Sequence, residues 1–152
     1  MSNTIANILI INGVNLACLG TREIDVYGKV SFSEYYEELK RRFDNVEISV
    51  YQSDLEGEIA TKISQTKNVD AIILNAGAYT HSSLVIADAI SSTSVPVIEV
   101  HISNIFGREN YRKNSRISSV CTGFISGFGL QSYDLAIESI IIKKDIKPFE
   151  IK

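Results

Sequence analysis

The sequence predicts an α/β fold in which a parallel sheet lies between two layers of helices. Short apolar segments alternate along the chain with segments whose apolar residues recur at helical spacing. Several of the short segments are apolar at every position, which is typical of strands that are covered on both faces. The 152 residues contain no repeat and no linker, so we expect a single domain over residues 1–152.

The first predicted strand is the apolar run of residues 8–11, and a long loop separates it from the first helix. Ser31 and Glu34 have the spacing of a capping box, and apolar residues then recur at helical spacing as far as Phe43. Apolar and polar residues alternate over 46–50, which favours an edge strand.

A second pair with capping-box spacing, Ser53 and Glu56, predicts the start of the next helix. The apolar run 71–74 is the third predicted strand. A helix over about 80–91 follows it, and residues 97–100 form the fourth predicted strand.

A strand within residues 120–125 and a helix over about 132–143 complete the pattern. Alternating strands and helices predict a three-layer sandwich, and right-handed crossovers favour the flavodoxin-like strand order 2-1-3-4-5. Such sheets bind ligands beyond the carboxyl ends of the strands, where the strand order reverses. The residues that follow the first, third and fourth strands are therefore the candidates for function.

The composition argues against several classes of protein. A net charge of −3 gives little electrostatic support for nucleic-acid binding. No apolar run approaches the roughly 20 residues of a membrane span and no signal-peptide pattern opens the chain, so we expect a cytoplasmic protein. Dinucleotide, P-loop and nucleophile-elbow motifs are absent, and Cys18 and Cys121 lack a metal-binding spacing.

Arginine is concentrated outside the helical patterns. Fixed positive charge in the loops of an acidic protein favours a site for a small anion, although solvated surface arginines would give the same pattern. Four of the six arginines lie in the segments 12–28 and 102–116, namely Arg22, Arg108, Arg112 and Arg116.

Both histidines of the chain, His81 and His101, follow predicted strands at their carboxyl ends. Glu99 lies two residues before His101 on one strand, so the two side chains share a face of the sheet. A carboxylate beside an imidazole prepares a general acid or base. The alternatives are a buried ion pair without a catalytic role and a metal site formed by Glu99, His101 and His81.

Tyr27 and Arg22 lie together in the loop after the first strand. Tyrosine ordinarily has a pKa near 10 and is a weak base at neutral pH, but an adjacent guanidinium favours the phenolate. The pair could therefore supply a catalytic base, whereas a tyrosine that only packs is the alternative.

These strand-end segments resemble the type II dehydroquinases, in family order and across nearly the whole chain. The resemblance implies a hydro-lyase without cofactor or metal that converts 3-dehydroquinate into 3-dehydroshikimate, in the shikimate pathway or in quinate breakdown. The matching stretches are residues 11–16, 19–23, 27–28, 52–53 with 56–58, 75–83, 99–104, and 108–109 with 112.

The resemblance also implies catalytic roles. Tyr27, activated by Arg22, would remove the proton next to the ketone, and a water held by Asn15 would stabilise the resulting enolate. His101, oriented by Glu99, would protonate the departing hydroxyl and complete an anti elimination.

The same resemblance implies binding roles. Backbone amides of Ile102 and Ser103 would hold the substrate carboxylate. His81 and Arg112 would bind the ring hydroxyls, and Asn75 would help to place the substrate and its departing hydroxyl.

The family's assembly implies a homo-dodecamer built from trimers, in which Asp88 reaches the site of a neighbouring subunit. Arg108 would anchor the active-site loop. Asp88 points away from the apolar stripe expected on its own helix, which is formed by Val85, Ile86, Ala89 and Ile90.

Two further interpretations stay open on the sequence alone. One is a flavodoxin-like binding module that holds a nucleotide or flavin, which a colourless protein that releases no flavin on denaturation would contradict. The other is a catalytically inactive relative with a structural role. The retained polar residues at the strand ends argue against the second, since a structural role does not require them.

Overall fold

The computed structural model describes residues 3–21, 25 and 28–145. Within this part of the chain a five-stranded parallel sheet has the order β2-β1-β3-β4-β5, which confirms the predicted order. The edge position predicted for the second strand is also confirmed. The strands are β1 (Ala6–Asn12), β2 (Val46–Gln52), β3 (Ala71–Asn75), β4 (Val97–His101) and β5 (Gly123–Ser126).

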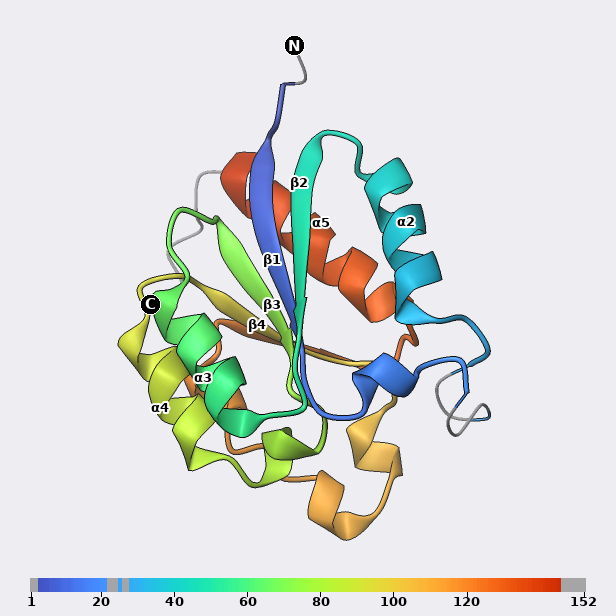
Figure 1. The fold of residues 1–152 in the computed structure, drawn as a ribbon, viewed down its shortest axis with the longest axis vertical. Coiled ribbons are helices and arrows are strands. Elements are labelled where there is room, and N and C mark those ends of the chain that lie inside the picture. Colours follow the sequence, from blue (N-terminus) through green and yellow to red (C-terminus); the bar gives the residue numbers. More distant parts are fainter. Residues whose placement is uncertain (1–2, 22–24, 26–27, 146–152) are drawn as a thin grey trace.

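Helices cover both faces of the sheet and give the three expected layers. These helices are α2 (Phe32–Arg42), α3 (Glu56–Gln65), α4 (Leu84–Ser92) and α5 (Gln131–Asp145). Figure 1 shows α2 and α5 on one face and α3 and α4 on the other. In the described ranges, no helix is long and apolar enough to cross a bilayer.

Alternate residues of the central strands supply the two cores. Ile8, Ile10 and Ile73 pack beneath α2 and α5. Leu9 and Ile72, their neighbours along the strands, pack beneath α3 and α4. This alternation explains why β1 and β3 are apolar at consecutive positions: both of their faces are covered.

The capping box predicted at Ser31 is confirmed. The hydroxyl of Ser31 accepts a hydrogen bond from the Glu34 N–H at 3.2 Å, and the Glu34 carboxylate accepts one from the Ser31 N–H at 2.9 Å. The two side chains satisfy orphan amides at the start of α2.

The second predicted capping box is wrong. Leu55 is the N-cap residue of α3 and makes no side-chain capping hydrogen bond. The Ser53 hydroxyl donates to Glu58 instead, and Glu56 accepts a hydrogen bond from Ser83 at the start of α4. Ser53 and Glu56 therefore bind other side chains, Glu58 nearby in α3 and Ser83 before α4, and do not cap the helix together.

The helix predicted over 80–91 begins later in the structure. Gly77–His81 form a 3-10 turn, η2, and α4 begins after Ser83, whose hydroxyl accepts the Ile86 N–H at 2.9 Å. An added Cβ at Gly77 would lie 2.5 Å from the Val14 carbonyl oxygen, and its φ of +60° also favours glycine. The tight turn keeps the residues after β3 close to the end of β1.

Two smaller differences concern exposure and strand length. Val85 is 52% exposed, whereas Ala87 is buried, so the buried stripe of α4 is shifted from the predicted one. Strand β5 begins at Gly123, because Ser118–Val120 form a 3-10 turn, η5, where the sequence predicted the strand's first residue.

Short 3-10 turns gather at the carboxyl ends of the strands. They lie together at one end of the sheet in Figure 1. Besides η2 after β3, they are η1 (Leu16–Cys18) after β1, and η3 (Ile105–Gly107) and η4 (Asn110–Arg112) after β4.

Candidate active site

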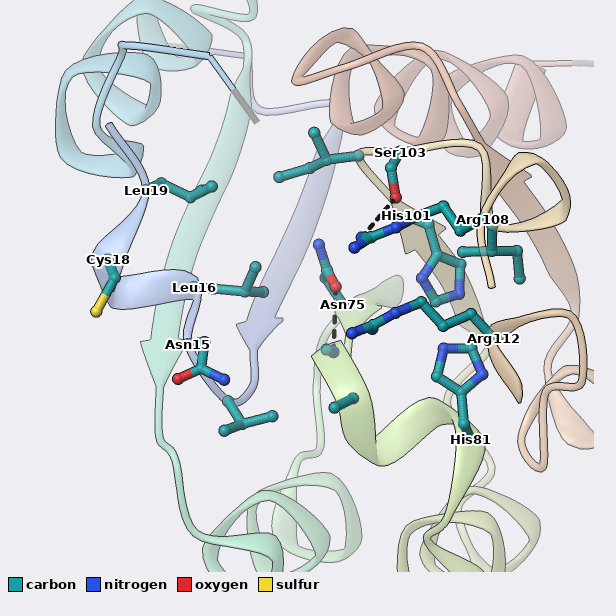
Figure 2. A pocket seen from close by; sticks show the side chains of 15 residues that line it. Asn15, Leu16, Cys18, Leu19, Asn75, His81, His101, Ser103, Arg108 and Arg112 are labelled. Carbon is teal, nitrogen blue, oxygen red and sulfur yellow. Dashed lines mark hydrogen bonds between the residues drawn. The ribbon is translucent and has the colours of Figure 1, made fainter. Parts of the chain in front are cut away.

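A pocket opens beyond the carboxyl ends of β1, β3 and β4, at the point where the strand order reverses. This is where the fold class predicts a ligand site. Figure 2 shows its side chains converging from three segments of the chain. The polar side chains in its lining are Asn15, Asn75, His81, His101, Ser103, Arg108 and Arg112.

The segment after β1 is held in an uncommon backbone conformation. Asn15 has φ 67°, in the left-handed region that asparagine tolerates better than most residues. Its N–H donates to the carboxylate of Asp54 at 3.0 Å. An added Cβ at Gly13 would lie 2.6 Å from the Ala76 carbonyl oxygen, so glycine is required for the close approach of β1 and β3.

Asn75 is held from both ends of its amide. Its Oδ1 accepts the Gly77 N–H at 3.2 Å, and its Nδ2 donates to the Tyr133 hydroxyl at 3.0 Å. Tyr133 in turn donates to Oδ1 of Asn12 at 2.7 Å, and burial raises the pKa of Tyr133, so its hydroxyl stays protonated. This chain of hydrogen bonds fixes the orientation of the Asn75 side-chain amide.

Glu99 and His101 form a buried pair. Glu99 is fully buried, His101 is nearly so, and Nε2 of His101 lies 2.6 Å from Oε2 of Glu99. The prediction that the two side chains share one face is confirmed. The other carboxylate oxygen, Oε1, accepts hydroxyl hydrogens from Ser115 at 2.9 Å and Ser118 at 2.7 Å. Donors therefore satisfy both oxygens of this buried carboxylate.

His81 lies beside His101 in the pocket wall, with the two ring centroids 6.4 Å apart. Its Nδ1 is 2.8 Å from the carbonyl oxygen of Asn114, so Nδ1 carries the proton and Nε2 is an acceptor in the neutral ring. Burial lowers the pKa of His81 below its usual 6.5, and the charges of His101 and Arg112 act in the same direction. His81 is therefore neutral at neutral pH.

Of the three clustered arginines that the structure describes, Arg108 and Arg112 line the pocket. Arg112 contacts Glu109 through Nε at 3.0 Å, and Arg108 donates to the Ser103 hydroxyl at 3.5 Å. Figure 2 shows both side chains extending toward the pocket from the segment after β4. Arg116 is exposed and is not part of the pocket lining. Arg108, which we expected only as a loop anchor, lies in the wall itself.

The described residues offer no ligand cluster for the metal site that Glu99, His101 and His81 could have formed. In the part of the chain that the structure describes, no group of three or more His, Cys, Asp or Glu side chains could hold a metal ion. Glu99 contacts His101 directly, and His81 uses Nδ1 to bind a carbonyl oxygen.

The amino-acid sequence matches a known protein family. The family model described as dehydroquinase class II covers residues 6–141. The chain belongs to the class II dehydroquinases. The match includes the three strands that end at the pocket and the segments that follow them, so family membership extends to the candidate site.

Individual proteins named 3-dehydroquinate dehydratase are similar to the chain over most of its length. A 3-dehydroquinate dehydratase of Thermoanaerobacter pseudethanolicus is 51% identical over 141 residues, which are 91% of this chain and 95% of that protein. The 3-dehydroquinate dehydratase of Prochlorococcus marinus is 45% identical over 144 residues, 93% of this chain and 98% of that protein.

Crystal structures of class II dehydroquinases share the fold. The type II dehydroquinase of Butyrivibrio crossotus superposes with a TM-score of 0.85 at 41% identity, covering 89% of this chain and 97% of that one. The enzyme of Propionibacterium acnes gives a TM-score of 0.84 at 35% identity, covering 91% and 97%.

Most of the residues that the dehydroquinase resemblance singled out surround the pocket. Glu99 lies behind His101, whereas Asp88 is exposed on α4 and is not part of the lining. Tyr27 and Arg22 lie outside the described residues, so their roles as the catalytic base and its activator stay predictions. The lining contains Asn15, Asn75, His81, His101, Ile102, Ser103 and Arg112.

The sequence analysis overlooked the residues that support the site from behind. Ser115 and Ser118 bind Glu99, and Asp54 binds the backbone of Asn15. Tyr133 binds Asn75. A buried carboxylate needs donors, so Glu99 was a signal that such hydroxyls exist, but nothing in the sequence says which serines they are.

Proposed function

We propose that this class II dehydroquinase dehydrates 3-dehydroquinate to 3-dehydroshikimate by anti elimination through an enolate, without a cofactor. The observation that carries the proposal is the buried Glu99–His101 pair, which lies in a pocket at the strand-order reversal of a chain that belongs to this family. Relatives named 3-dehydroquinate dehydratase at 45–51% identity support the substrate.

The reaction needs one base and one acid. Tyr27, as a phenolate favoured by Arg22, removes a proton from the carbon next to the ketone, and the electron pair moves to the ketone oxygen. A water held by Asn15 donates to this enolate oxygen. The enolate then collapses, the C–O bond breaks, and His101 gives a proton to the departing hydroxyl. Water leaves, and Tyr27 holds the proton that balances the one lost by His101.

Glu99 prepares His101 for this role. Nε2 of His101 is bound to the buried carboxylate, so Nδ1 is the nitrogen that serves the substrate. The negative charge of the carboxylate stabilises the imidazolium, the form that acts as a general acid.

The substrate carboxylate binds the N–H groups of Ile102 and Ser103 in the proposed complex. Both residues line the pocket, and within the described residues neither N–H donates to a protein acceptor. Arg108 and Arg112 add positive charge. Two free amides beside a guanidinium form a suitable nest for an anion.

The ring hydroxyls of the substrate bind His81 and Arg112. Neutral His81 offers Nε2 as an acceptor, so it fits a hydroxyl group as donor. Asn75, whose amide is fixed by Gly77 and Tyr133, places the departing hydroxyl near His101.

The proposed assembly is a homo-dodecamer of trimers in which Asp88 completes the site of the neighbouring subunit. Asp88 is exposed on α4, and the apolar side chains of Leu84 and Val85 are 63% and 52% exposed on the same helix, which supports a contact there. We place the enzyme in the cytoplasm, where the unpaired Cys18 and Cys121 would stay reduced.

Replacement of the proposed base tests the mechanism. With 3-dehydroquinate in buffer alone, the parent should produce the ultraviolet absorbance of a conjugated enone. Tyr27→Phe should still bind the substrate but lose turnover by about 100-fold or more, because general base catalysis contributes at least that much.

A matched control is Tyr51→Phe on β2, which removes a hydroxyl outside the pocket lining and should keep the parental rate. If Tyr27→Phe turns over the substrate at the parental rate, Tyr27 is not the catalytic base. A parent protein that forms no enone would reject the proposed function as a whole.

A further inference from the structure

We infer that Ser115 and Ser118 are positioning residues for His101 that act through Glu99. Their hydroxyls stabilise the negative charge of Glu99 and so keep the proton that the two side chains share on the imidazole. The inference rests on the proposed role of His101 as general acid, and it deepens that role by naming the groups that maintain its charge.

The carboxylate of Glu99 divides its two oxygens between different partners. Oε2 faces Nε2 of His101 at 2.6 Å, and Oε1 accepts both serine hydroxyls, at 2.9 Å from Ser115 and 2.7 Å from Ser118. Glu99 is 0% exposed, so bulk water does not replace these donors. A chain of hydrogen bonds therefore runs from Ser115 and the first residue of η5, through Glu99 on β4, to His101 in the pocket.

The other titratable groups that face Glu99 do not supply a compensating positive charge. Burial raises the pKa of Cys121 to about 12, and the charge of Glu99 raises it further, so the thiol stays neutral. Burial lowers the pKa of His81, so that imidazole is neutral at neutral pH as well. Arg112 acts on His81, on the pocket side. The serine hydroxyls are thus the dipoles that offset the burial of the carboxylate on its Oε1 side.

Burial alone would favour the shared proton on Glu99, where His101 could not use it as a general acid. Transfer of the proton from His101 to Glu99 replaces an ion pair by a neutral pair, and a site that excludes water penalises charged forms. Hydroxyl donors stabilise the carboxylate and not the carboxylic acid, so they oppose this transfer. A neutral imidazole is a much weaker acid than an imidazolium, so the location of this proton controls the second step of the reaction.

Ser118→Ala is the clearest test. The Ser115 hydroxyl also accepts the N–H groups of Ile117 and Ser118, whereas the bond found for the Ser118 hydroxyl is the one to Glu99. Loss of one donor to a buried charge should lower kcat about tenfold and leave KM within about twofold.

A second readout requires no substrate. The protonation of the His101 ring can be followed by NMR in the folded enzyme, and the chain has only one other histidine to assign, His81. Through a pH titration, the ring in Ser118→Ala should show a smaller imidazolium signal than in the parent, because a carboxylate that has lost a donor competes better for the shared proton.

Three further variants separate the inference from a general loss of structure. Ser118→Thr keeps the hydroxyl and should restore both readouts, and Ser118→Cys, a weaker donor of similar size, should give intermediate values if the alanine variant does not fold. In a Glu99→Gln background, Ser118→Ala should change neither kcat nor the ring titration further. Ser64→Ala, which removes a hydroxyl bound to the Ala60 carbonyl in α3, is the surface control and should match the parent.

Parental ring titration and kcat in Ser118→Ala would overturn the inference. An equal effect of Ser118→Ala with and without the Glu99 carboxylate would also overturn it, because the serine would then act by another route. The ring titration decides the point even if the parent does not dehydrate 3-dehydroquinate, so failure of the inference and failure of the proposed function are distinguishable.

Discussion

His81 is a residue whose protonation is determined by its surroundings. Burial lowers its pKa from the usual 6.5, with His101 and Arg112 adding to the effect, while the bond to Asn114 opposes it. In the unfolded chain the same ring has its ordinary pKa. As the pH falls through 6.5, His81 therefore binds a proton more readily in the unfolded chain than in the folded one. The folded state loses stability in this pH range.

His81→Asn should remove this pH-dependent loss, because an asparagine amide can still donate to the Asn114 carbonyl but does not titrate. Urea unfolding of parent and variant at pH 8 and pH 5 measures the effect. Between these two pH values the parent should lose more stability than the variant. An equal loss in both proteins would show that His81 titrates alike in the folded and unfolded chain.

At the residue level, the side-chain contact that could be predicted joins two residues close in the sequence. Glu99 and His101 are two positions apart on a strand, and the period of a strand decides that they meet. Ser115 and Ser118 lie in an irregular segment 16 and 19 residues beyond Glu99, and no periodicity links them to it. Their contact depends on how that segment folds back over β4, which the sequence pattern does not specify.

Helix α5 is connected to the site by one buried side chain. Tyr133 is fully buried, donates to Asn12 at the end of β1 and accepts from Asn75 at the end of β3. Asn12 and Asn75 are register partners, so a single hydroxyl joins both strands at the reversal point. In the described residues Nδ2 of Asn12 has no hydrogen-bond partner, so the Tyr133 hydroxyl is the only side-chain partner of that buried amide.

Tyr133→Phe should therefore lower the free energy of unfolding by about 1–3 kcal/mol, because two buried polar groups lose a partner that water cannot replace. Thermal and urea unfolding both measure this. The matched control is Tyr36→Phe in α2, which loses a bond to the Ile48 carbonyl at a partly exposed site and should cost less than about 1 kcal/mol. Equal losses in the two variants would contradict the argument.

Elements with strong local signals were predicted, and elements fixed by tertiary contacts were not. The Ser31–Glu34 box is confirmed, and among the described residues the two side chains bind each other's backbone at an exposed site. At Ser53 and Glu56 the same spacing fails because Glu58 and Ser83 compete for the two side chains. Contacts between elements override a local signal when a nearby partner is better placed.

At the scale of the whole molecule, strand order could be predicted because few topologies satisfy short, right-handed connections. The same order places the ends of β1, β3 and β4 together and so defines the pocket. The exposure of side chains on α4, by contrast, was not predicted correctly. Val85 was expected to be buried and is 52% exposed, because the sequence pattern does not distinguish an apolar side chain that packs against the sheet from one that stays on the surface.

Asp88 provides a test of that surface. It is exposed on α4 and lies outside the pocket lining, yet the proposed assembly places it in the site of a neighbouring subunit. Asp88→Ala and His101→Ala should each be nearly inactive as pure proteins. In the proposed assembly each site needs His101 from its own subunit and Asp88 from the neighbour, so the two defects lie in different subunits of one site.

Co-expression of the two variants with different affinity tags should therefore restore activity. In random mixed oligomers about a quarter of the sites combine an intact His101 with an intact neighbouring Asp88, so about a quarter of parental turnover should return. The pure variants mixed without subunit exchange are the control and should stay inactive. Mixed oligomers that show no recovery would mean that Asp88 does not act across a subunit boundary, and the exposed face of α4 would then need another explanation.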